Sequence, residues 1–427
     1  MKIHIAGGRV VDPASGLDEH CDLFIAAGRI AGVRMAPAGY VADRRIDARG
    51  CVVCPGLVDL SARLREPGYE YRATLESELA AAVAGGVTTL ACPPDTDPPL
   101  DEPGLVEMLK YRARSLNFAN VLPVGALTLG LAGTRITEMG ELSEAGCVAF
   151  GQGVVPVADT AVLLRAMEYA APFDYAVWLQ PLEAFLVRGG VAHDGEVATR
   201  LGLAGIPTLA ETLALDSLLS LAQATGVRLH VCRVSSAAGL HRIEAARAAG
   251  VKVTCDVAVH HLMLSDENIA HFDPNCHLVP PLRSFADREA LRQGLADGRI
   301  TALCSDHTPV DDDAKQLPFA EAEPGASGLE LLLPLALRWG AELGLSLCQA
   351  LARISCDPGR VLGGGVGHLS VGAIADLCIF DPQESWLVCR DTLVSQGKNT
   401  PYLGQTLNGR VRYTLRAGQV VFERQGR

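Results

Sequence analysis

The chain has 427 residues, of which 49% are hydrophobic and 20% charged, a composition typical of a folded globular protein. Its 37 basic and 49 acidic residues give a formal charge of −12, which argues against nucleic acid or an anionic membrane as a partner. No apolar run approaches the ~20 residues needed to span a bilayer, and the first residues lack the pattern of a secretory signal. We therefore expect a cytoplasmic protein that binds neither membranes nor nucleic acid.

Thirteen cysteines, an odd number, lie mostly within apolar runs. This favours buried reduced thiols over a framework of disulfides. Cys51 and Cys54 have the spacing of a zinc-binding pair, but no second pair follows them, so packing in the core is the favoured interpretation.

Both ends of the chain alternate short β-type runs with glycine turns, and Gly409–Arg424 is predicted to be a hairpin that turns at Ala417-Gly418. The middle alternates helices with short apolar runs. The helical runs are Thr74–Ala84, Pro207–Thr225, Ala237–Ala249 and Asp287–Ala296. The eight candidate strands are Val52–Leu60, Val87–Pro93, Val121–Ala126, Cys147–Gly151, Tyr175–Gln180, Val227–Val234, Val251–Val257 and Ile300–Asp306.

This alternation predicts an α/β fold with a (β/α)₈ TIM barrel over residues 55–365. Residues 1–54 and 366–427 are predicted to form a small β-sandwich domain jointly. A doubly wound sheet is the competing fold, but no GxGxxG follows the first strand. Because barrel active sites lie where the strands end, the polar residues at those ends are the candidate site. These residues are Asp59, Ser61, Arg63, Arg65, Asp95, Gln152, Gln180, Arg233, His260, His261, Asp306 and His307.

The segment PGLVDLSARLREPG, residues Pro55–Gly68, resembles the first-strand motif of dihydroorotases and related cyclic amidohydrolases. Further segments resemble that family in its own order: AGGVTTLACPPDTDPP, RLHVCRVSS, VTCDVAVHHLMLSDE, VPPLRSFADREAL, ITALCSDHTPVDDDAKQ, GASGLELLLPL, VGAIADLCIFDP and QGKNTPYLGQTLNGRV. LREPG and NTPYLG point to dihydroorotase over allantoinase or hydantoinase. The resemblance covers nearly the whole chain and implies the barrel fold.

The resemblance also implies a metal site: two histidines on strand one, a carboxylate or carboxylated lysine on strand four, histidines on strands five and six, and an aspartate on strand eight. The corresponding residues here are Ser61, Arg63, Gln152, Gln180, Arg233 and Asp306. Only Asp306 is of the expected type, and an arginine cannot ligate a metal because its guanidinium stays protonated. We therefore predict no metal, no cofactor and no hydrolase activity.

The positions that would contact substrate are changed as well. The family's asparagine on strand two is Asp95, the asparagine before PPLR is Val279, and the histidine that ends the strand-eight motif is Val310. Only Arg65 is kept. An aspartate repels an anionic substrate and a valine removes a hydrogen bond, so these positions are predicted to be vestigial.

A buried carboxylate needs a cation or a proton, so we hypothesise that Arg63 and Arg233 stand beside Asp306 in place of the two metals. Because the arginines outnumber Asp306, a residual anion site is an alternative. In a regular strand, the side chains of His230 and Arg233 lie on opposite faces. Since Arg233 is expected to face the barrel axis, His230 is expected to point away from it. The loop Thr308–Ser327 has no substrate to close on and is expected to be mobile.

Non-catalytic relatives of this kind are known as subunits that hold together the catalytic chains of aspartate transcarbamoylase in bacterial pyrimidine synthesis. The resemblance therefore implies a structural role, with a homodimer inside a larger hetero-oligomer. Three alternatives stay open: a divergent cyclic amidohydrolase, a small-anion sensor, and a non-catalytic dihydropyrimidinase relative that scaffolds cytoskeletal proteins. LREPG and NTPYLG argue against the last of these.

Overall fold

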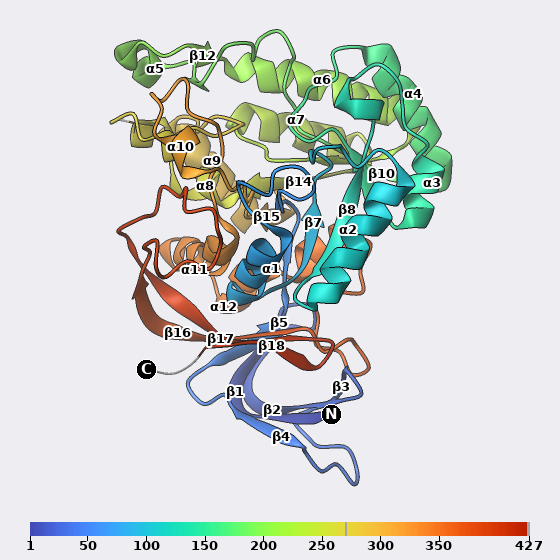
Figure 1. Ribbon diagram of the computed structural model, residues 1–427, viewed down its shortest axis with the longest axis vertical. Coiled ribbons are helices and arrows are strands. Elements are labelled where there is room, and N and C mark those ends of the chain that lie inside the picture. Colours follow the sequence, from blue (N-terminus) through green and yellow to red (C-terminus); the bar gives the residue numbers. More distant parts are fainter. Residues whose placement is uncertain (270, 425–427) are drawn as a thin grey trace.

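Eight short parallel strands form a barrel in the middle of the chain. The computed structural model describes residues 1–269 and 271–424, and Figure 1 shows the barrel and its helices above a separate sheet. The barrel strands follow one another in sequence order: β6 (Leu57–Asp59), β7 (Val87–Cys92), β8 (Asn120–Ala126), β9 (Ala149–Gly151), β10 (Ala176–Leu179), β13 (Arg228–Val231), β14 (Val253–Ala258) and β15 (Ala302–Cys304). Just beyond the first and last of them, Arg63 N–H donates to the His307 carbonyl at 2.9 Å and His307 N–H donates to the Ser61 carbonyl at 3.1 Å. These bonds close the ring at the end that carries the candidate site.

Helices cover the outside of the barrel, and the four predicted helices are among them. The helices are α1 (Leu75–Ala84), α2 (Pro103–Leu116), α3 (Met139–Ala145), α4 (Thr160–Ala170), α6 (Thr208–Thr225), α7 (Ala237–Ala248), α8 (Val259–Met263), α9 (Phe285–Ala296), α11 (Leu332–Glu342), α12 (Leu347–Ala352) and α13 (Cys356–Val361). The short helices α5 (Glu196–Leu201) and α10 (Asp312–Lys315) and the small pair β11 (Ala192–His193) and β12 (Gly205–Ile206) lie in loops. Helix α9 begins two residues earlier than predicted, because the Ser284 hydroxyl accepts the N–H of Asp287 and caps the helix there.

The run Val52–Leu60, which we predicted as one barrel strand, is in fact two strands in two different sheets. β5 (Val52–Pro55) pairs with β1 and β16, and β6 pairs with β7 in the barrel. Gly56 lies between them, and a Cβ atom there would lie 2.1 Å from the Thr88 hydroxyl oxygen. The run is apolar throughout, so nothing in its pattern marks the point where the chain changes sheets.

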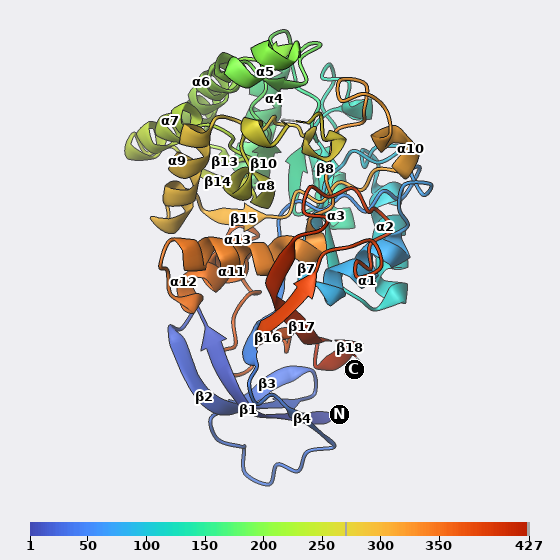
Figure 2. The same ribbon diagram turned by 90° about the vertical axis from the view of Figure 1, so that its left-hand side faces the viewer.

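The second sheet combines strands from both ends of the chain. It contains β1 (Lys2–Asp12), β2 (Leu17–Ala26), β3 (Arg29–Val33), β4 (Arg44–Asp47), β5, β16 (Leu377–Leu387), β17 (Thr406–Arg416) and β18 (Gln419–Glu423). The order is β18-β17-β16-β5-β1-β2-β3, with β4 beside β1, so β5 joins the two terminal halves. Figure 2 shows this sheet at the end of the molecule opposite α5 and α6. Its core joins residues of the two ends: Ile3, Ile5, Leu23, Ile25, Leu377, Ile379 and Leu415.

Two hairpin turns from opposite ends of the chain pack against each other in this sheet. Ala27-Gly28 joins β2 to β3, and Ala417-Gly418 joins β17 to β18 as predicted. All four residues have a positive φ, +49° and +75° in the first turn and +46° and +70° in the second. A Cβ atom on Gly28 would lie 2.8 Å from the Ala417 carbonyl oxygen, so the two turns meet at a glycine on each side.

Two expectations from the sequence concern the state of the cysteines and the presence of membrane-spanning helices. All 13 cysteines are free, and most are buried. In the described part of the chain, no helix combines the length and apolar character needed to cross a membrane.

Replacing Gly28 with alanine should destabilise the protein more than the same change at Gly16. Both glycines have φ near +74°, at +75° and +73°, but only Gly28 is crowded, whereas a Cβ atom on Gly16 has nothing within 4 Å. We expect Gly16→Ala to lower the free energy of unfolding by about 1–2 kcal/mol from backbone strain alone. Gly28→Ala should cost at least about 1 kcal/mol more because the second turn must move. Urea denaturation compares the two variants, and equal losses would mean that the contact between the turns does not contribute.

Candidate functional site

Five of the six positions that correspond to metal ligands meet at the carboxyl end of the barrel: Asp306 with three others around it, and the fifth, Gln180, through Arg233. Ser61 and Arg63 follow β6, Arg233 follows β13, and Asp306 follows β15. The Ser61 hydroxyl accepts a hydrogen bond from Arg233 Nη1 at 3.0 Å and donates one to Asp306 Oδ1 at 3.2 Å. A single serine hydroxyl therefore connects the arginine to the aspartate.

Two guanidinium groups flank the carboxylate of Asp306. Arg63 Nη1 lies 3.4 Å and Arg233 Nε lies 3.5 Å from Asp306 Oδ1. The three side chains are buried, with 5%, 4% and 7% of Arg63, Arg233 and Asp306 exposed. This arrangement is the one expected if the two arginines stand in place of the two metals, because both cations lie within ion-pair range of the carboxylate.

Asp95 belongs to the same cluster, through a pairing that the sequence did not predict. We expected it to face and repel an anionic substrate, but its Oδ2 accepts a hydrogen bond from Arg63 Nε at 2.8 Å. Burial raises the pKa of Asp95, but the Arg63 guanidinium outweighs this and the net shift is downward. Two carboxylates therefore balance Arg63 and Arg233, and the excess of positive charge that favoured an anion site is smaller than the sequence indicated.

The two glutamines behave differently. Gln180, after β10, accepts a hydrogen bond from Arg233 Nη2 at 2.7 Å and so belongs to the cluster. Gln152, after β9, instead donates to the Thr128 hydroxyl at 2.8 Å and to the Leu131 carbonyl at 2.9 Å. Burial lowers the pKa of Arg233, but the Asp306 carboxylate outweighs it and the net shift is upward. Arg233 is therefore a permanent cation at the centre of the site.

The prediction that His230 points away from the barrel axis is also wrong. Its ring packs on Trp178 with centroids 4.8 Å apart, and Trp178 belongs to the cluster of side chains that fills the barrel. His230 Nε2 lies 2.9 Å from Asp256 Oδ2. The prediction assumed that side chains alternate regularly between the two faces of the strand. Arg233 has φ +55°, which breaks this alternation and turns its side chain inward as well. Asp306 also has a positive φ, at +47°.

The positions predicted to be vestigial substrate contacts do not gather around one pocket. Arg65 is buried and donates from Nε to the Pro309 carbonyl at 2.8 Å. Val310 is buried, and its N–H donates to the side chain of Asn399 at 3.0 Å, whereas Val279 is half-buried. The Nε of Arg65 is therefore engaged with backbone.

Asn399, in the NTPYLG segment, holds both ends of the loop Thr308–Ser327. Its Nδ2 donates to the carbonyls of Thr308 and Gly325 at 3.0 and 3.1 Å, and its Oδ1 accepts from the Ser327 hydroxyl at 3.1 Å. Both ends of this loop are therefore held by side-chain hydrogen bonds, and its mobility stays a prediction. The sequence analysis used NTPYLG only as a family marker and missed this role.

Three histidines near the barrel mouth serve the packing. Burial lowers the pKa of His260 to about 3 and that of His261 to about 4, so both are neutral at pH 7. His260 stacks on Tyr402, and His261 Nε2 lies 3.2 Å from the Pro281 carbonyl. His307 pairs with the buried Glu78, which gives it a structural role.

The donor set at the mouth does not fit the metal pair that the family resemblance implies. Ser61 and two protonated guanidiniums lie beside Asp306, and none of these is a usual ligand for a divalent ion. Gln180 and Asp95 are bonded to those guanidiniums. Among the described residues, the one group of three candidate donors within 4.8 Å of one another is His230, Cys232 and Asp256, inside the barrel. There Asp256 already accepts the Arg233 N–H at 2.7 Å, and burial raises the pKa of Cys232. No reaction step is therefore derived through a metal.

Sequence reasoning missed two further members of the site. Thr308 accepts a hydrogen bond from Arg63 Nη1 at 2.9 Å, and Asp256 connects the Arg233 backbone to His230. Neither residue lies at a position for which the motif comparison specified a role. Asp256 could have been found as a carboxylate in a buried strand, because such a group requires a partner.

Comparison with known proteins agrees with this geometry. The family model for dihydro-orotase-like proteins matches residues 50–238, and that of the amidohydrolase family matches residues 194–421. A dihydroorotase-like protein of Pseudomonas aeruginosa is 48% identical over 99% of this chain and 100% of its own length. A protein named dihydroorotase from a Geobacter species is 40% identical over 99% of this chain and 100% of its own. L-hydantoinase (dihydropyrimidinase) of Arthrobacter aurescens superimposes with a TM-score of 0.89 at 25% identity, covering 99% of this chain and 96% of that one.

The barrel and its composite terminal sheet are those of an amidohydrolase. Within the amidohydrolases, the chain belongs to the dihydroorotase-like family.

Replacing Asp306 with asparagine should destabilise the protein strongly. The change keeps the shape of the side chain but leaves two buried guanidiniums without their shared carboxylate. We expect a loss of about 3–5 kcal/mol in the free energy of unfolding at pH 7, measured by urea denaturation. The matched control is Asp216→Asn, which breaks an exposed pair with Arg242 at 2.9 Å and should cost less than about 1 kcal/mol. Similar small losses in both variants would contradict a charged, stabilising Asp306.

Proposed function

We propose that this chain is a catalytically inactive dihydroorotase homologue. The observation that carries the proposal is the position of Arg63 and Arg233, whose guanidiniums both lie within 3.5 Å of Asp306 Oδ1. A divalent ion at this point would be repelled by two permanent cations, and Asp306 is the one carboxylate among the six positions that correspond to metal ligands. Without a metal, no bound water is brought to a pKa near 7 and the scissile carbonyl is not polarised.

An active enzyme with a rearranged site is the alternative that the named relatives raise. Asp306 alone, as a general base, would supply at most about 10²–10⁴-fold in rate. Its carboxylate is also occupied, because it accepts from Ser61 and faces both guanidiniums. These interactions therefore favour a structural cluster over a poised base.

We further propose that the chain acts by assembly, as a cytoplasmic structural subunit of an aspartate transcarbamoylase complex in pyrimidine biosynthesis. The dihydroorotase-like family membership supports this proposal, as do LREPG and NTPYLG in the sequence. The core of the barrel is well packed while its mouth carries a charge-balanced cluster, which suits a protein that works through its surface. A homodimer within a larger hetero-oligomer is the assembly we propose.

The purified chain should neither retain zinc nor convert dihydroorotate. After incubation with zinc and dialysis, we expect no stoichiometric metal by elemental analysis and no turnover in either direction, because two permanent cations occupy ligand positions and Asp306 is the one carboxylate among those six positions. The Geobacter dihydroorotase, prepared and assayed in the same way, is the control for metal loading and for the assay. Stoichiometric zinc together with turnover would overturn the proposal of inactivity.

Mixing this chain with the aspartate transcarbamoylase catalytic chain of the same organism should produce a new, larger species. Size-exclusion chromatography with light scattering on each chain alone and on the mixture gives the masses and the stoichiometry. The Geobacter dihydroorotase in place of this chain serves as the specificity control. Two independent peaks from the cognate mixture would contradict the assembly role while leaving the proposal of inactivity intact.

A further inference from the structure

A cavity of about 360 Å³ lies at the amino end of the barrel, at the end opposite the mouth that carries the ion-pair cluster. It is lined by residues at the start of three neighbouring strands, β10, β13 and β14, and by the end of α13. Arg63, Arg233 and Asp306 do not line it, so it is separate from the site at the mouth. Its volume is at the lower end of the range for small-molecule sites.

Strand pairing places two cations side by side at this end of the barrel. In the pairing of β13 with β14, Leu229 lies beside Val253, so one residue earlier Arg228 lies beside Lys252. Both of these cations line the cavity, and Arg360 at the end of α13 lines it as well. Like charges on neighbouring strands destabilise each other, and an anion between them removes this cost.

Two of the three cations have a carboxylate partner. Arg228 Nε lies 3.0 Å from Asp174 Oδ1, and Arg360 pairs with Asp357. Lys252 is exposed, and its ammonium group has no ion pair or side-chain hydrogen bond in the described part of the chain. No acidic side chain is found among the described residues that line this cavity. The lining therefore carries an excess of positive charge, which favours an anionic ligand.

The remaining walls are mostly apolar and include an indole ring. Trp178 lines the cavity, and its ring packs on that of His230 with centroids 4.8 Å apart. Ala176 comes two residues earlier on the same face of β10 and adds only a methyl group to the wall. Val361 of α13 packs against the cluster of side chains inside the barrel. Such walls suit the apolar body of an organic anion rather than a small inorganic ion.

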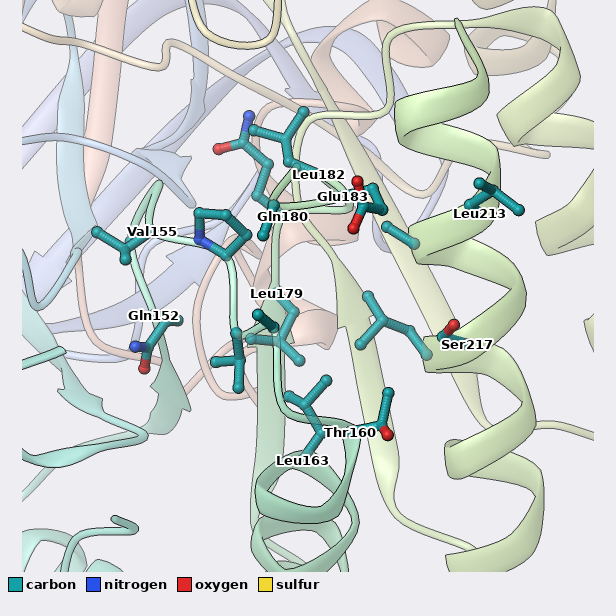
Figure 3. Close-up of a pocket in the computed structure, with 17 residues that line it drawn as sticks. Gln152, Val155, Thr160, Leu163, Leu179, Gln180, Leu182, Glu183, Leu213 and Ser217 are labelled. Atoms are coloured by element: carbon teal, nitrogen blue, oxygen red, sulfur yellow. The ribbon is translucent and has the colours of Figure 1, made fainter. Parts of the chain in front are cut away.

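A second cavity, beside the mouth, has a different charge. It has a volume of about 300 Å³ and lies between α4 and α6, where Figure 3 shows Leu163 on α4 and Ser217 on α6. Of the described residues in its lining, none is a lysine, arginine or histidine, and Glu183 is the one acid. This second cavity offers apolar surface without a positive charge, so it is the natural comparison for a ligand that needs both.

We propose that the cavity at the amino end of the barrel binds a small organic anion, with its apolar body against Trp178 and its acidic group between Lys252 and Arg360. Because barrel active sites lie at the carboxyl ends of the strands, an anion bound here is a ligand and not a substrate. The inference goes beyond the proposals of inactivity and of assembly, and it depends on neither.

The test uses 8-anilinonaphthalene-1-sulfonate, an organic anion whose fluorescence rises in apolar surroundings, and its uncharged analogue N-phenyl-1-naphthylamine. Titration of the full chain with the sulfonate should saturate at one site per chain. Lys252→Met removes a charge at an exposed position that tolerates the change, and should weaken sulfonate binding by about threefold to tenfold. Adding Arg360→Met to this variant should weaken it by about tenfold or more. The affinity for the uncharged analogue should be the same in wild type and in both variants.

Two control variants locate the site. Arg165→Met removes an exposed cation on α4 that does not line the cavity, and should leave sulfonate binding unchanged. Ser217→Leu fills the second cavity and should also leave it unchanged.

Absence of saturable sulfonate binding, or equal affinity in wild type and the double variant, would overturn the site. An equal loss for the uncharged analogue would overturn the assigned role of the cations. Loss of sulfonate binding in Ser217→Leu would place the dye in the second cavity and would also overturn the proposal. All of these measurements use the chain alone, so their outcome is independent of zinc binding, turnover and partner assembly.

Discussion

The carboxylate of Asp306 between two buried guanidiniums is the interaction on which the barrel mouth depends. Removing three ionised groups from water is expensive, and their mutual attraction offsets this only when the geometry is good and the remaining donors are bonded. Here Ser61, Gln180, Asp95 and Thr308 supply those further bonds. The cluster is thus a unit whose members come from five different strand ends or loops. Its energetics favour a single arrangement of the barrel mouth.

The same cluster explains why some residues at the mouth have an unusual backbone. Arg233 and Asp306 have left-handed φ angles of +55° and +47°, which for residues with a Cβ atom cost roughly 1–2 kcal/mol each. These angles turn the two side chains toward each other across the top of the ring. Residues hold such conformations only where the surrounding contacts determine them, and the shared hydrogen bonds of Ser61 and the N–H bond from Arg233 to Asp256 do so here.

The sequence predicted the barrel and the shared terminal sheet well, because strand and helix periodicities and glycine turns are local signals. It also predicted that Arg63 and Arg233 approach Asp306, since a buried carboxylate needs a counter-charge. It failed where the outcome depends on long-range geometry. The pairing of Asp95 with Arg63 joins two different strand ends. The inward orientation of His230 follows from the left-handed backbone of one nearby residue, Arg233. The change of sheets at Gly56 leaves no mark in an apolar run. The position of Gln152 away from the cluster likewise depends on a bond to Thr128 in a neighbouring loop.

The two glutamines at the strand ends differ in how their amides are bonded. Gln152 donates to the Thr128 hydroxyl and the Leu131 carbonyl, so it belongs to a neighbouring loop and not to the ion-pair cluster. Gln180 accepts from Arg233 Nη2, while its own Nε2 is buried and has no hydrogen-bond partner among the described residues. A carboxylate at position 180 would add a further negative charge to a cluster in which Asp95 and Asp306 already face Arg63 and Arg233. The neutral amide bonds to Arg233 and leaves this charge balance unchanged.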